Sequence, residues 1–145
     1  MIQYQKEGLP ERLPIRLAGS TTRAILDAGE FASSRNHPYI DTAHLAMALL
    51  VDPDVQQELL MRGINTEKVR AILEELTLRH EDTPYYPPRL TERAKLAITL
   101  AGIEAQTDGA IELTSLHLLR GIVREGEGIG ASVLESEGLS YRDFS

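Results

Sequence analysis

Two histidines occupy equivalent places in two similar segments of the chain. His44 lies in YIDTAHLAMALL and His117 in IELTSLHLLRGIV, each near the start of an apolar stretch. A histidine can act as a general base beside a nucleophile and an orienting carboxylate, or as a metal ligand with close partners. Neither segment carries an HExxH pattern, and His37 and His80 are interpreted as loop residues. The pattern favours partly buried histidines at helix starts, hydrogen-bonded to the neighbouring chain. A small hydrolytic or metal-dependent enzyme using His44 or His117 is kept as the alternative.

A glycine-rich stretch, REGEGIG from Arg124 to Gly130, is the second candidate for chemistry. A dinucleotide fingerprint requires G-x-G-x-x-G between a strand and a helix, and a P-loop ends in Gly-Lys-Ser or Gly-Lys-Thr. Here the spacing differs, the stretch follows an apolar segment, and Glu125 and Glu127 would repel a phosphate. The first copy makes the same corner with VDPDV, two residues shorter. We therefore interpret the stretch as a corner between helices, with glycines supplying backbone freedom.

The remaining chemical groups do not form a catalytic pattern. Glu74 and Glu75 are expected on the outward, solvated face of a helix, and no G-x-S-x-G elbow occurs. The chain has no cysteine, which excludes disulfides, thiolate zinc sites and cysteine nucleophiles. The sequence predicts no catalytic residue, no cofactor and no metal site.

Composition limits the kinds of partner. The formal charge of -7 argues against nucleic acid and fits a protein or basic peptide as partner. No uncharged apolar run approaches 18 residues, so no membrane span is expected, and the first twenty residues lack the apolar core of a signal peptide. We expect a cytoplasmic protein that is a monomer in isolation.

The chain contains an internal duplication of about 70 residues. The second copy repeats the first at these pairs of positions: Ala28 and Ala101, Ala32 and Ala105, Ile40 and Leu113, Thr42 and Ser115, His44 and His117, Leu49 and Ile122, Gly63 and Gly138. Each copy has the apolar spacing of helices, and no stretch shows the alternation of a strand. The predicted fold is all-α, a tandem repeat of two four-helix units.

The helix boundaries follow from caps and apolar spacing. The first helix is predicted from Ser20 to about Ser34, and its counterpart from Thr91 as N-cap through Ala105. The second helices are capped by Asp41 or Thr42 and by Thr114 or Ser115, and the third helices end at left-handed Gly63 and Gly138. The fourth helix starts at Asn65, with these residues inward: Val69, Ile72, Leu73 and Leu76. In the second unit the fourth helix is only begun, in SYRDFS.

Four parts of the chain are predicted in order. They are an N-terminal arm (1–17), a first repeat (18–79), a proline-rich linker (80–89) and a second repeat (90–145), which together form one compact domain. The prolines of HEDTPYYPPRL cannot continue a helix. Tyr85 and Tyr86 of the linker are expected to pack over the seam between the units, or to dock a partner.

Longer segments resemble a known family. LTERAKLAITLAGIEAQTDG and TSLHLLRGIVREGEGIGASVLESEGL resemble the second repeat of the N-terminal domains of ClpA- and ClpC-type AAA+ unfoldases, and YIDTAHLAMALLVDPDVQQELLMRGIN resembles the first repeat. The resemblance covers about Ala18 to Asp143. It implies a pseudo-twofold pair of four-helix units, the double Clp repeat fold, with the last helix truncated.

The resemblance also implies a function. Such domains recruit adaptor proteins and unfolded or tagged substrates, without catalysis, for an ATPase ring that feeds a ClpP-type peptidase. The positions to examine for peptide or adaptor binding are Thr42, His44, Thr91, Glu92, Ser115 and His117. Some members bind phosphorylated arginine through a glutamate just before the repeat histidine. Ala43 and Leu116 stand at those positions here, which removes the partner of the guanidinium in both copies.

Two contexts are open for the chain. It contains no Walker motif, so it does not itself hydrolyse ATP. The unfinished last helix favours a domain cut from a full unfoldase. The amino-terminal arm favours a free-standing accessory subunit that docks on the Clp machinery, in the plastid stroma if the source is a plant.

Overall fold

The first unit contains four helices, and side-chain caps set the starts of three of them. The structure, a computed structural model, describes residues 15–78 and 87–144. The first four helices are α2 (Gly19–Ser34), α3 (Thr42–Leu49), α4 (Pro53–Met61) and α5 (Thr66–Leu76). The side chains of Asp41, Asp52 and Asn65 accept hydrogen bonds from backbone N–H groups at the starts of α3, α4 and α5. Gly63 follows α4 at a φ of 73°, which confirms its prediction as a left-handed residue.

The second unit repeats this order with a shorter last element. It consists of α6 (Glu92–Thr107), α7 (Ser115–Glu125), α8 (Ile129–Ser136) and the 3-10 turn η1 (Tyr141–Phe144). Thr91 and Thr114 cap α6 and α7 with their side chains, as predicted. Gly138 has a φ of 109°, also as predicted. The tandem arrangement of two helical units is therefore confirmed, with η1 in place of a fourth helix.

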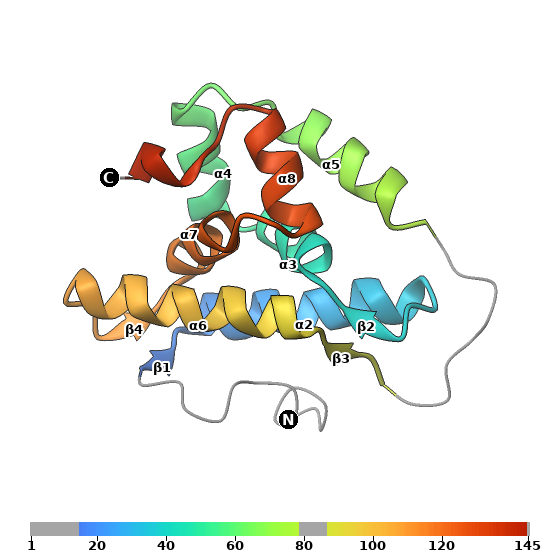
Figure 1. Ribbon diagram of the computed structural model, residues 1–145, viewed down its shortest axis with the longest axis horizontal. Coiled ribbons are helices and arrows are strands. Elements are labelled where there is room, and N and C mark those ends of the chain that lie inside the picture. The colour runs from blue at the N-terminus through green and yellow to red at the C-terminus, as the bar shows by residue number, and fades with distance from the viewer. Residues whose placement is uncertain (1–14, 79–86, 145) are drawn as a thin grey trace.

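The helices lie in two layers (Figure 1). In this view α2 and α6 run along the lower layer, and α3, α4, α5, α7 and α8 stand above them. Stripes of alanine allow close packing between the layers: Ala24, Ala28 and Ala32 on α2, and Ala97, Ala101 and Ala105 on α6, are all buried. The rest of the core is mainly aliphatic.

Two short parallel pairs join the units, although the sequence shows no strand pattern. Strand β1 (Arg16–Leu17) pairs with β4 (Glu112–Leu113), and β2 (Tyr39–Ile40) pairs with β3 (Arg89–Leu90). Each pair places the residues before a first helix beside the residues before the other unit's second helix. The two pairs lie at opposite ends of α6 in Figure 1. Pairs of two residues are too short to show alternation, which is why the sequence does not reveal them.

One inward residue was predicted wrongly. Val69 and Leu73 of α5 are buried and Ile72 is partly buried, but Leu76 exposes 54% of its surface. Leu76 is the last residue of α5, where the helix extends past the core and borders a cavity. None of the helices in the described part of the chain combines the length and apolar character needed to cross a membrane.

Candidate functional site

The starts of α3 and α6 are joined by their caps. Asp41 Oδ1 accepts hydrogen bonds from the backbone N–H of Thr42 at 2.8 Å and from the hydroxyl of Thr91 at 3.1 Å. Thr91 Oγ1 in turn accepts from the backbone N–H of Ala94 at 3.0 Å. One carboxylate and one hydroxyl thus stabilise two helix starts from different units.

His44, the third residue of α3, is buried and bonded through both ring nitrogens. The backbone N–H of Asp41 donates to His44 Nδ1 at 2.9 Å, so this nitrogen carries no proton. His44 Nε2 therefore donates to His37 Nδ1 at 2.8 Å, and His37 Nε2 donates to the backbone carbonyl of Leu78 at 2.8 Å. This relay orients both rings and ties the chain after α5 to the start of α3.

The relay removes His44 from acid–base chemistry near neutral pH. Burial, and then the neighbouring ring of His37, lowers the pKa of His44 to about 4, although Asp41 acts in the opposite direction. A proton added at His44 Nδ1 would face the Asp41 N–H. With both nitrogens engaged, His44 offers no lone pair to a metal or a substrate.

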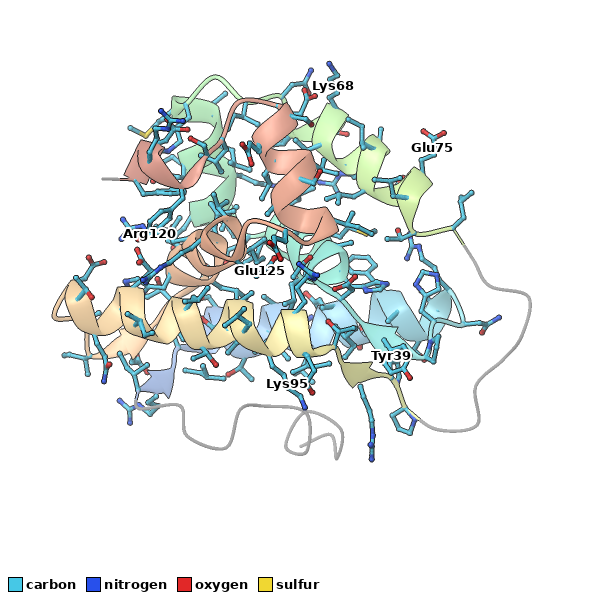
Figure 2. All side chains as sticks on the ribbon, viewed as in Figure 1. Tyr39, Lys68, Glu75, Lys95, Arg120 and Glu125 are labelled. Carbon is cyan, nitrogen blue, oxygen red and sulfur yellow. The ribbon has the colours of Figure 1, made fainter. Side chains whose placement is uncertain are left out.

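A cavity of about 360 Å³ opens beside this relay. Its lining residues come from both units and are His37, Pro38, Tyr39, Asp41, Ala43, His44, Leu76, Thr77, Thr91 and Ile129. We call it the His44 pocket. Tyr39, Leu76 and Ile129 are exposed at 57%, 54% and 38%, so apolar surface meets the solvent around it. Tyr39 belongs to β2, and Figure 2 shows it at the lower right of the view. Such a pocket suits an apolar side chain.

The equivalent end of α7 has different chemistry. The Thr114 N–H donates to His117 Nδ1 at 3.0 Å, so His117 Nε2 donates to Asp108 Oδ2 at 3.0 Å. Asp108 also accepts from Arg120 at 2.9 Å, and the hydrogen bond from His117 lowers the pKa of Asp108. Ala110 stands where the first unit has His37, so the histidine pair is not repeated.

The last described turn covers this second end. The guanidinium groups of Arg62 and Arg120 lie 4.6 Å and 5.5 Å from the centre of the Phe144 ring. Phe144 packs partly buried against the core, and so does Leu116, which is equivalent to Ala43 of the His44 pocket. In Figure 2, Arg120 lies on the left side of the view and Tyr39 at the lower right.

Comparison with known proteins identifies the fold and the family. The family model described as Clp repeat (R) N-terminal domain matches residues 16–136. The chain belongs to this family. It is 30% identical over 135 residues to the chloroplastic chaperone protein ClpC of Pisum sativum, covering 92% of this chain and 15% of that protein. It is 33% identical over 118 residues to the negative regulator of genetic competence ClpC/MecB of Bacillus subtilis, covering 78% of this chain and 14% of that protein.

A solved structure shares the fold at low sequence identity. The ClpV N-domain in complex with a VipB peptide has a TM-score of 0.73 and 18% identity, with 99% of this chain and 87% of that chain covered. The chain spans about one seventh of the length of the two ClpC proteins, so it corresponds to their Clp repeat region alone.

Two of the six predicted site residues line the His44 pocket of this Clp N-domain, namely His44 and Thr91. Thr42 follows Asp41 directly but points to α8, where its hydroxyl accepts a hydrogen bond from the Gly130 N–H at 3.1 Å. Glu92 is exposed and pairs with Lys95 at 3.4 Å. The structure therefore gathers only part of the predicted set, and the binding role of these residues stays a proposal.

Ser115 and His117 lie at the second end. His117 caps α7 with Thr114, as the helix-start interpretation predicts. Ser115 is buried, and its hydroxyl has no hydrogen-bond partner within the described residues. Its backbone N–H donates to Ser20 Oγ at 3.3 Å.

Sequence reasoning missed several residues of the His44 pocket. His37 lies in the turn between α2 and β2, as its interpretation as a loop residue predicted, but the sequence did not reveal that it is buried and bonded to His44. Tyr39, Leu76 and Ile129 were not predicted to line a site, because their positions in the sequence do not reveal that three elements meet there. The seven-residue spacing between His37 and His44 was the available signal. His80, Tyr85 and Tyr86 lie outside the described residues.

The glycine loop is a corner between helices, as predicted, but its glycines do more than supply freedom. Gly126 ends α7 at a φ of 78° and does require that freedom. A Cβ at Gly128 would collide with the Thr42 hydroxyl, and a Cβ at Gly130 would lie 2.8 Å from the Thr42 carbonyl oxygen. These two glycines are required by the close approach of α8 to α3. In the part of the chain that the structure describes, no three His, Asp or Glu residues are grouped to hold a metal.

Proposed function

We propose that this Clp N-domain is a non-catalytic recognition module of the Clp chaperone and protease system. It binds segments of adaptor or substrate proteins for an AAA+ unfoldase, which passes the substrate to a ClpP-type peptidase. The observation that carries the proposal is the His44 pocket, an open cavity with an apolar rim. The same role serves a domain of a larger unfoldase or an accessory subunit that docks on the Clp machinery.

The polar wall of the pocket supports binding rather than chemistry. Asp41 caps α3 and receives the Thr91 hydroxyl, and His44 is bonded on both nitrogens. The Thr77 hydroxyl donates to the backbone carbonyl of Leu73 at 2.7 Å. Because these hydrogen bonds hold the helix starts together, a partner gains little by displacing them, and we attribute the free energy of binding to covering of the apolar rim.

Similar proteins support the kind of partner. The ClpV N-domain is found in complex with a VipB peptide, and the two ClpC proteins come from a bacterium and a chloroplast. These origins support the proposal that the protein acts in the cytoplasm, or in the plastid stroma if its source is a plant. Ala43 gives the pocket a methyl group in place of a carboxylate, so we assign it an apolar side chain rather than a phosphorylated arginine.

The proposal is tested with a reduced and carboxymethylated model protein, which stays unfolded, labelled for fluorescence anisotropy. Ile129→Lys places a charge at the rim of the pocket and should weaken binding by about tenfold, as loss of a well-placed apolar contact does. Ile111→Lys is the matched control, since Ile111 is 83% exposed in the second unit and should bind as the wild type does. Circular dichroism checks that both variants fold. Equal affinity of the two variants, or no binding by the wild type, would overturn the proposal.

A further inference from the structure

A second cavity of about 420 Å³ lies between α2 and the corner that joins α3 to α4. Its lining residues are Ser20, Arg23, Ala24, Asp27, Ala48, Val51, Asp52 and Pro53. We call it the Asp52 pocket. It shares no residue with the His44 pocket. Its walls combine alanine, valine and proline with two carboxylates and one guanidinium.

Only one oxygen of the Asp52 carboxylate accepts hydrogen bonds within the described residues. Asp52 Oδ1 accepts from the backbone N–H groups of Asp54 and Val55 at 2.9 Å and 3.1 Å, which caps α4. Asp52 Oδ2 makes no hydrogen bond or ion pair within the described residues. Asp27 is paired with Arg23 at 3.4 Å, but the Arg23 side chain is 77% exposed, so this pair leaves Asp52 untouched.

In the second unit, the equivalent space is occupied by Arg93 of the same unit. Arg93 is the equivalent of Ser20, and Glu125 is the equivalent of Asp52. Arg93 Nη1 donates to Glu125 Oε2 at 3.0 Å and to Glu127 Oε2 at 3.1 Å. Glu125 Oε1 meanwhile accepts from the Gly128 N–H at 2.8 Å. Both carboxylates therefore hold the start of a third helix with one oxygen, and only in the second unit does a guanidinium take the other.

The Glu125 carboxylate shows how well this position holds a guanidinium. The Glu125 side chain is 2% exposed, and it lies near the centre of the view in Figure 2. A carboxylate so far removed from water is stabilised by a charged partner. In the first unit, Ser20 is too short to reach Asp52, and the cavity remains.

We propose that the Asp52 pocket binds an arginine side chain of a partner protein, with the guanidinium at Asp52 Oδ2 and the aliphatic stem along the apolar wall. The proposal rests on the proposed function, because the arginine would belong to a segment that the domain recognises. A guanidinium on a carboxylate forms a charge-assisted hydrogen bond, and the net charge of -7 attracts basic segments. The pocket thus adds a preference for basic residues to a domain whose other pocket suits apolar ones.

The probe is the blocked tripeptide acetyl-Ala-Arg-Ala-amide, titrated into isotope-labelled protein while backbone amide shifts are recorded by NMR. We expect saturable shifts at the amides of Ser20, Ala48 and Asp52. The same peptide with citrulline, which has the shape of arginine without the charge, should bind about tenfold more weakly. Equal binding of the two peptides, or no saturable shift at these amides, would overturn the proposal.

Two variants separate a specific site from general attraction to an acidic surface. Asp52→Asn keeps the helix cap, since asparagine caps as well as aspartate, and should weaken the arginine peptide by about tenfold. Asp54→Asn removes the same charge two residues away, outside the lining of the pocket, and should leave affinity unchanged. Equal weakening by both variants would contradict the proposal. Ser20→Arg should reproduce in the first unit the arginine–carboxylate pair of the second unit, and should abolish binding of the arginine peptide.

Failure of this inference differs from failure of the proposed function. If the carboxymethylated protein binds through Ile129 while the arginine peptide leaves Ser20 and Asp52 unmoved, the Asp52 site is wrong and the recognition function stands. If the arginine peptide binds at Asp52 while the carboxymethylated protein does not bind, the Asp52 site stands and the recognition function is wrong.

Discussion

The two units share one helical plan but build the corner between their second and third helices in different ways. In the first unit, Asp52 caps α4 within the same unit, and its side chain accepts a hydrogen bond from the Val55 N–H. In the second unit, the equivalent N–H of Gly130 is satisfied by Thr42, which belongs to the first unit. Ser115 is the counterpart of Thr42, and its hydroxyl has no partner in the described structure because Asp52 already serves that role. The two units thus provide a hydrogen-bond acceptor for the equivalent backbone N–H groups with different side chains.

The same comparison explains where the cavities lie. Gly121 lets α7 approach α6 so closely that a Cβ there would collide with the Ala97 carbonyl oxygen. Ala48 is its equivalent in the first unit, where the methyl group keeps α3 away from α2 and lines the Asp52 pocket. The second unit is further closed by Arg93 and Phe144. Both described cavities are therefore lined mainly by residues of the first unit, which is where we propose that partners bind.

The largest effect on stability is expected when Gly121, at the contact between α7 and α6, is replaced by alanine, the residue at the equivalent position of the first unit. Gly121→Ala should destabilise the fold by about 3 kcal/mol, because the methyl group would lie 2.7 Å from the Ala101 Cβ and 2.8 Å from its backbone nitrogen. Urea unfolding measures the change. Gly19→Ala is the control, since a Cβ there meets nothing within 4 Å, and it should change stability by less than about 0.5 kcal/mol. A loss below about 1 kcal/mol at Gly121 would contradict the close contact.

His44 of the first unit should make stability depend on pH. The folded-state pKa of His44, about 4, lies below the unfolded value of 6.5, so the unfolded chain binds the proton first. The groups that face His44 are His37, Asp41 and Arg35. The part of the free energy of unfolding that depends on a neutral His44 ring is present in full above pH 6.5. It is lost as the pH falls towards 4, and the loss is about 2 to 3 kcal/mol at pH 4.5.

Unfolding in urea from pH 7.5 to 4.5 tests this dependence. His44→Gln should be less stable than the wild type at pH 7.5 but should lose less on acidification. His117→Gln is the control at the equivalent position and should retain the acid-dependent loss that belongs to His44. Equal slopes for the wild type and His44→Gln would refute the assignment of a buried neutral ring.

Exchanging the two equivalent hydroxyls sharpens the comparison of the corners. Thr42→Val removes the acceptor of the buried Gly130 N–H and should cost about 2 kcal/mol. Ser115→Ala removes a hydroxyl without a partner in the described structure, so stability should stay within about 0.5 kcal/mol or rise slightly. Thermal unfolding of both variants provides the measurement, and equal losses would show that the corners do not differ as described.

Local signals predicted much of this fold. The repeated spacing of His44 and His117 revealed the duplication, and threonine, aspartate and asparagine marked the helix starts, because their side chains satisfy free N–H groups. Gly63 and Gly138 marked helix ends for an equally local reason, since their positive φ suits glycine. The family resemblance implied the same pair of units, in agreement with the duplication.

The site was less predictable because it depends on contacts between distant parts of the chain. The burial of His37 follows from its bond to Leu78, 41 residues away. The need for Gly128 and Gly130 follows from Thr42, which lies in the other unit. Leu76 has the spacing of an inward residue, yet it borders an open pocket because nothing in the described structure covers the end of α5 there. Periodicity reports which face of a helix is apolar, but not how far its neighbours extend.

The most direct test of the account is the position of a bound partner on the domain. Addition of the carboxymethylated protein to isotope-labelled domain should weaken the amide signals of Tyr39, Ala43 and Ile129 while leaving those of Ile111 and Arg120 unchanged. Signal loss centred on the second end, or spread evenly over both units, would contradict the claim that the first unit carries the binding surface.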